Sequence, residues 1–146
     1  MPLPLIFPRA VTILILIVGA TTRSEAGIAI PKRTVRMTND LGGGLDLTVH
    51  CKQKDEDLGV HLLHPNETYE FTFRPNFWGT TLYFCGFSWP GVLHWFNIFT
   101  MKRDFKKCFT CIWQIRQDKP CRLGKKSHVF DDCYNWSSSS FIPHFS

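Results

Sequence analysis

The stretch Thr81-Leu82-Tyr83-Phe84-Cys85-Gly86-Phe87-Ser88-Trp89 decides the fold class. Aromatic and other strand-forming residues occupy both faces of this segment, a pattern typical of a central strand that is covered on both sides. Turn residues end it on each side, with Gly79 before it and Pro90-Gly91 after it. The sequence therefore predicts a buried β-strand over these nine residues.

Shorter segments around this strand alternate between apolar and polar residues. The alternation covers residues 35–38, 45–51 and 69–74, and two more strand-like segments cover residues 95–101 and 111–115. Glycine, proline and asparagine clusters separate these segments, and no sustained helical stripe follows residue 26. We predict an all-β domain over residues 27–136, a small disulfide-stapled antiparallel β-sandwich or barrel. The large side chains expected between two sheets are Phe71, Phe73, Phe84, Trp89 and Trp113.

The chain begins with the features of a secretory signal. Arg9 precedes an apolar run over residues 10–20, which has the length of a signal-peptide core and is too short to cross a bilayer readily. Small residues up to Ala26 predict cleavage after that residue, with Ala20 as an alternative. Residues 1–26 are therefore predicted to be a signal peptide and the protein to be secreted, with no stable membrane insertion after cleavage. An uncleaved membrane anchor is the competing interpretation.

The net charge of the mature chain favours a class of surface but does not identify a partner. Removal of the signal peptide leaves a net charge of about +4, which favours anionic surfaces such as acidic wall polymers or membranes. Residues 137–146 are serine-rich and lack bulk, so we expect a flexible C-terminal tail.

Six cysteines follow the signal peptide, and an even number in a small secreted chain predicts disulfides and no free thiol. Strand parity places Cys111 on the inner face and Cys108, three residues earlier, on the opposite face. We therefore expect these two cysteines not to pair. The expected bridges join Cys51 and Cys85 to Cys111 and Cys121, and Cys108 to Cys133.

The cysteines, the acidic residues 55–57 and the histidines favour structural roles over metal binding or catalysis. A zinc ribbon needs a second close cysteine pair, which is absent, and the block at residues 55–57 lacks the ligand spacing of a calcium loop. Histidines occur at positions 50, 61, 64, 94, 128 and 144, but no nucleophile motif accompanies them. We expect no metal, no cofactor and no catalytic residue. Two sequons predict N-glycosylation, at Asn66 and at Asn135.

Several blocks of this chain together resemble the plant self-incompatibility S1 proteins, a family of small secreted S-protein homologues. The blocks are residues 50–59 (HCKQKDEDLG), 69–73 (YEFTF), 81–89 (TLYFCGFSW), 103–104, 108–115 (CFTCIWQI) and 120–121. The resemblance covers nearly the whole mature chain. It implies a disulfide-stapled β-sandwich with one or two short helices, and an extracellular ligand that is not an enzyme.

Two loops are predicted to contact a cell-surface receptor of unknown identity. The first holds Lys102, Arg103, Asp104 and Phe105, a charged stretch around an aromatic residue, and the second holds Asp55, Glu56 and Asp57. We expect a monomer and no nucleic-acid partner.

Two other functions make different structural predictions. A secreted hydrolase would gather His50, His61 or His94 beside a carboxylate. A defence protein that binds cell wall or lipid would bring the basic residues of positions 102–107 and 125–126 into one patch.

Overall fold

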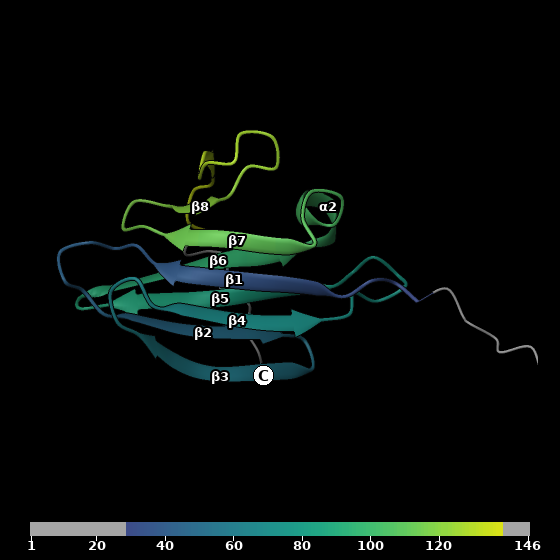
Figure 1. The fold of residues 1–146 in the computed structure, drawn as a ribbon. Coiled ribbons are helices and arrows are strands. Elements are labelled where there is room, and N and C mark those ends of the chain that lie inside the picture. The colour runs from purple at the N-terminus through teal and green to yellow at the C-terminus, as the bar shows by residue number, and fades with distance from the viewer. Residues whose placement is uncertain (1–28, 139–146) are drawn as a thin grey trace, which may run out of the picture.

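The computed structural model describes residues 29–138, which form two β-sheets around a shared core (Figure 1). The first sheet has the order β4-β1-β7-β8-β9, with β4 (Thr68–Phe73), β1 (Arg33–Asn39), β7 (Thr110–Ile115), β8 (Pro120–Arg122) and β9 (Asp132–Cys133). The second has the order β3-β2-β5-β6, with β3 (Glu56–Leu63), β2 (Leu47–Gln53), β5 (Leu82–Trp89) and β6 (Val92–Thr100). A single turn of helix, α2 (Met101–Asp104), follows β6. The predicted all-β sandwich with a short helix is confirmed.

One strand pair departs from the predicted antiparallel arrangement. β1 and β7 run parallel, with Val35 opposite Cys111 and Met37 opposite Trp113. A parallel pair needs a long crossover, and here the crossover contains the entire second sheet and α2. Local alternation carries no information on strand direction, so the sequence did not reveal this pair.

The predicted loop that holds Asp55, Glu56 and Asp57 is in large part a strand. β2 turns at Lys54-Asp55, and β3 begins at Glu56 and pairs antiparallel with β2. β3 lies at the edge of its sheet, where charged residues can face solvent without being buried. The prediction of a loop was wrong because acidic residues and glycine are depleted in strands in general but are tolerated at such edges.

The core follows the predicted alternation, with one exception. Phe71, Phe73 and Trp113 lie inside, and Trp113 is 0% exposed with its ring edge-on to Phe96 at 5.3 Å between centroids. Phe84 is also buried, but it packs on the outer face of β5, where its ring lies 6.1 Å from that of Trp95. Its predicted place between the sheets was wrong. Trp89 is half-buried against the core.

All six cysteines form disulfides, but the predicted pairing was wrong. The bridges are Cys51–Cys85, Cys108–Cys111 and Cys121–Cys133. The first and last join residues directly opposite each other on paired strands. Cys108 lies before the start of β7, in a stretch that turns after α2, so strand parity did not apply to it.

The ends of the chain lie mostly outside the described residues. These include the predicted signal peptide, residues 1–26, and all but two residues of the predicted tail. Ser137, the first residue of that tail, donates its backbone N–H to the carbonyl of Trp95 at 2.9 Å. Among residues 29–138 no helix has the length and apolar character needed to cross a membrane.

Replacement of Trp113 by alanine tests the core. We expect Trp113→Ala to lower the free energy of unfolding by about 3–5 kcal/mol, because it removes core contacts and leaves a cavity. Trp78→Ala is the matched control, since that indole is 82% exposed, and it should change stability by less than about 0.5 kcal/mol. Chemical denaturation of both variants measures the difference. Equal losses would contradict the assigned inner face of β7.

Candidate functional site

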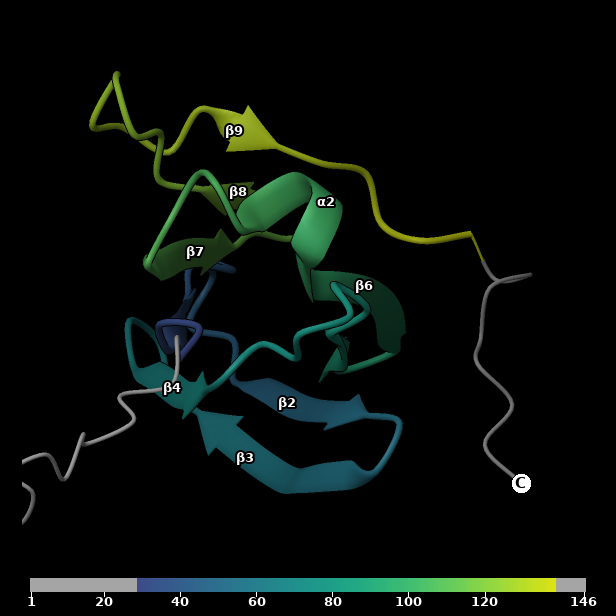
Figure 2. The same cartoon turned by 90° about the vertical axis from the view of Figure 1, so that its right-hand side faces the viewer.

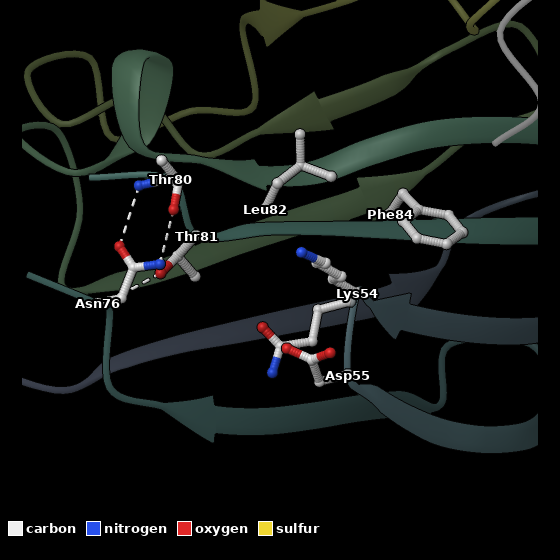
Figure 3. Close-up of a pocket in the computed structure, with 8 residues that line it drawn as sticks. Lys54, Asp55, Asn76, Thr80, Thr81, Leu82 and Phe84 are labelled. Carbon is white, nitrogen blue, oxygen red and sulfur yellow. Dashed lines mark hydrogen bonds between the residues drawn. The ribbon is translucent and has the colours of Figure 1, made fainter. Parts of the chain in front are cut away.

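A hollow of about 250 Å³ opens at one end of the second sheet, between the β2–β3 turn and the loop from β4 to β5 (Figure 3). Leu82 and Phe84 give it an apolar wall, and Lys54 and Asp55 stand at the β2–β3 turn. Its remaining lining residues are Gln53, Asn76, Thr80 and Thr81. The hollow therefore combines an apolar wall with polar residues, and side chains of both signs of charge stand at the β2–β3 turn.

The loop from β4 to β5 is held in one shape by Asn76. The side-chain oxygen of Asn76 accepts the backbone N–H of Thr80 at 3.0 Å, and its amide nitrogen donates to the Thr80 hydroxyl at 2.8 Å. The backbone N–H of Asn76 donates to the buried hydroxyl of Thr81 at 2.8 Å. These three bonds close the loop at its base, as the dashed lines in Figure 3 show.

Phe77 and Trp78 stand at the tip of this closed loop. Phe77 is 84% exposed and Trp78 is 82% exposed, and their rings meet edge to face at 5.8 Å between centroids. Soluble proteins seldom leave two adjacent large aromatic side chains in water without a binding role. From the sequence we predicted only a turn residue at Gly79, and this exposed pair was missed. Adjacent aromatics inside a turn were the available signal.

The three acidic residues beside the hollow, Asp55, Glu56 and Asp57, make different contacts. Asp57 lies 2.6 Å from the His50 ring nitrogen, and it accepts the backbone N–H of Gly59 at 2.8 Å. The Gly59 N–H, followed by His50, lowers the pKa of Asp57 despite the opposing effect of desolvation. Glu56 accepts the hydroxyl of Tyr83 at 3.1 Å. Within the described chain Asp55 makes no ion pair or side-chain hydrogen bond, so of the three it is best placed to meet a partner.

The charged stretch after β6 is not the exposed loop that the sequence predicted. Asp104 is 0% exposed, and its carboxylate accepts from the Arg103 guanidinium, from Arg122 and from the backbone N–H of Thr100. The Arg103 guanidinium also lies over the rings of Phe96, Trp113 and Tyr134. The prediction of exposure was wrong for Arg103 and Asp104 because these two side chains pair with each other and face inward.

Lys102 and Phe105 differ from these two residues. Lys102 is exposed. Phe105 is half-buried, and the guanidinium of Arg33 lies 4.2 Å from the centre of its ring and 4.2 Å from the centre of the Phe109 ring. Phe105 therefore holds the end of β1 in place, and Lys102 is left as the exposed part of the predicted loop.

Each of the three candidate catalytic histidines packs against a different neighbour. His50 pairs with Asp57, His61 stacks on Tyr69 at 3.8 Å, and His94 stacks on Trp136 at 4.7 Å between ring centroids. Burial lowers the pKa of His94. His50 does lie beside a carboxylate, yet it does not line the hollow, and neither His61 nor His94 shares its partner. In the described part of the chain, no three histidine, cysteine or acidic side chains come together as a metal site would require.

Both sequons lie on the surface. Asn66 is exposed in the turn between β3 and β4 and has a φ of 65°, a left-handed conformation that asparagine adopts more readily than most residues. Asn135 is exposed after β9.

Comparison with known proteins identifies the family. Residues 34–136 match the family described as plant self-incompatibility protein S1. The chain belongs to this family. It is 47% identical to S-protein homolog 2 of Arabidopsis thaliana over 115 residues, which are 75% of this chain and 71% of that protein. It is 37% identical to S-protein homolog 20 of the same plant over 130 residues, covering 88% of this chain and 90% of that protein.

A solved structure shows the same fold. It is that of a self-incompatibility protein homologue from a family described as widespread, small, highly stable, secreted plant proteins. The similarity has a TM-score of 0.55 at 18% identity and covers 77% of this chain and 100% of that one. The resemblance noted in the sequence and the predicted secretion are thereby confirmed.

Replacement of Asp104 by asparagine tests the buried cluster around its carboxylate. Asp104→Asn leaves the guanidinium groups of Arg103 and Arg122 without their counter-charge, so we expect it to lower the free energy of unfolding by about 3–5 kcal/mol. Asp118→Asn, at an exposed position, is the control and should stay within about 0.5 kcal/mol of the parent protein. Chemical denaturation measures both. A stable D104N protein would show that the cluster is not structurally required.

The turn beside the hollow should respond to acid. Because the pKa of folded Asp57 is lowered, its contacts stabilise the hairpin above the pKa of the unfolded chain, and this contribution is lost as pH falls through the folded pKa. An NMR titration of the Asp57 carboxyl carbon should give a pKa below that of an ordinary aspartate. In His50→Gln the value should rise in part, because the Gly59 N–H remains. A titration at or above the ordinary value would contradict these contacts.

Proposed function

We propose that this secreted S1-family protein is an extracellular signalling ligand, recognised by a cell-surface receptor in pollen rejection or in another form of communication between cells. The observation that carries the proposal is the pair Phe77 and Trp78, held out in solvent by a clamped loop beside a hollow. We call the surface formed by Phe77, Trp78, Lys54 and Asp55 the recognition surface.

The chemistry of this surface suits a protein partner. Aromatic side chains supply a large part of the binding energy in protein interfaces, where charged residues at the rim add orientation. Because the loop is already closed by Asn76, little conformational freedom would be lost on binding. A receptor could bury the two rings while one of its own side chains enters the hollow.

A catalytic function has less support. His50, His61 and His94 each pack against a different neighbour, so these three histidines do not face one substrate together. We therefore propose that the protein acts as a monomer through its surface and is not an enzyme. We also propose Lys102 as a peripheral contact, since it is exposed at the start of α2.

We also propose that Asn66 carries an N-linked glycan. Its side chain lies exposed in a turn, the setting in which such glycans are accommodated without disturbing the core. Asn135 is exposed as well, and its proximity to Cys133 makes glycosylation there depend on whether the sugar is added before the disulfide closes.

Removal of the aromatic pair tests the proposal. The mature protein and a variant carrying Phe77→Ser and Trp78→Ser are labelled and added to recipient plant cells, and saturable surface binding is measured. We expect the variant to bind at least about ten-fold more weakly, as expected for the loss of interface anchors. Its thermal unfolding should be close to that of the parent, because both side chains lie in solvent.

The matched control replaces two exposed apolar residues elsewhere. Leu93→Ser with Val129→Ser removes side chains that are 60% and 55% exposed and lie outside the recognition surface. This variant should bind as the parent does. Normal binding by the Phe77 and Trp78 variant, or equal loss in the control, would exclude this surface as the recognition site.

A further inference from the structure

Two loops that are far apart in the chain bring four lysines around one shallow groove. Lys106 and Lys107 follow α2, and Lys125 and Lys126 follow β8. All four line a hollow of about 490 Å³, and three of them also line an adjoining hollow of about 270 Å³. Figure 2 shows the β8–β9 connection and α2 on the same side of the molecule. We call the two hollows together the lysine groove.

The lysines of the groove outnumber the carboxylates that line it, four to two. In the described part of the chain none of the four lysines forms an ion pair. The two carboxylates, Asp131 and Asp132, each have another partner, although Lys107 also acts electrostatically on Asp132. Asp131 accepts the hydroxyl of Ser127 at 2.9 Å, and Asp132 pairs with Arg122. Although burial opposes ionisation, Tyr134 and then Arg122 lower the pKa of Asp132.

Both loops are held in place without a ligand. The disulfides Cys108–Cys111 and Cys121–Cys133 fix one end of the first loop and both ends of the second. The second loop is also closed by the Gly124 N–H, which donates to the carbonyl of Val129 at 2.8 Å. A Cβ at position 124 would lie 2.2 Å from the Ser127 hydroxyl and 2.5 Å from a carboxylate oxygen of Asp131, so a larger residue would displace these two side chains. The lysines are thus presented on a preformed frame, which lowers the cost of binding.

We infer that the lysine groove binds a linear acidic polysaccharide, with uronate carboxylates paired to the ammonium groups. An ammonium ion is a point charge that accepts carboxylates from many directions, as a flexible polymer requires. Phe109, 66% exposed, lines the adjoining hollow and offers an apolar face to a sugar ring. A concave groove fits a chain better than a flat bilayer. This site differs from the recognition surface in every residue, so the two proposals stand independently.

A quadruple substitution tests the inference. Binding of the mature, oxidised protein to polygalacturonate is measured by titration calorimetry, with fully methyl-esterified polymer as the uncharged comparison. We expect polygalacturonate alone to bind, more weakly as salt increases. The variant K106Q/K107Q/K125Q/K126Q should lose at least about ten-fold in affinity. Thermal unfolding checks its fold, and if it fails to fold, K106Q/K125Q and K107Q/K126Q are measured as separate doubles.

The control variant removes the same charge from other positions. K32Q/R36Q/R74Q/K119Q lowers the net charge equally but leaves the groove and the recognition surface intact, so its affinity should stay within about two-fold of the parent. Equal losses in the two variants, or no binding of polygalacturonate, would overturn the inference. Tighter binding to phosphatidylserine vesicles than to polygalacturonate would also overturn it, in favour of a lipid surface. Unchanged polymer binding by the Phe77 and Trp78 variant would confirm that the two sites are separate.

Discussion

The carboxylate of Asp104 is the contact on which much of this structure depends. It lies in the interior at the end of α2, where an unpaired charge would be strongly destabilising. Arg103 from the same turn and Arg122 from β8 compensate it, and Arg122 continues to Asp132 of β9. One ionic network thus connects the end of the second sheet to the short strands of the first.

This network also explains how two short strands persist. β8 has three residues and β9 has two, which is less than a strand normally needs to be stable. The disulfide between Cys121 and Cys133 joins the two strands to each other, and Arg122 anchors β8 to Asp104 of α2. Side-chain and covalent contacts here replace the backbone hydrogen bonds that a longer strand would form.

Two surfaces of different chemistry are built on this frame, and separate devices hold them. Asn76 closes the loop that exposes Phe77 and Trp78, whereas the ionic network and two disulfides position the lysine groove. A secreted ligand with both could be retained by wall polymer through one surface and be recognised through the other. Retention by the polymer would then weaken as ionic strength rises, whereas receptor recognition would change less, because only the groove relies chiefly on charge.

Local patterns in the sequence were sufficient for some features of this protein. The alternation around Val35, Phe71 and Trp113 identified their strands and inner faces, because the side-chain period of a strand depends only on neighbouring residues. The family and secretion were also evident from the sequence. Only the tertiary structure decided the disulfide partners, the parallel β1–β7 pair, the burial of Asp104 and the gathering of the lysines. Each of these features depends on a contact between segments that are distant in the chain, or on a turn between two elements. Local periodicity does not specify which distant segments meet.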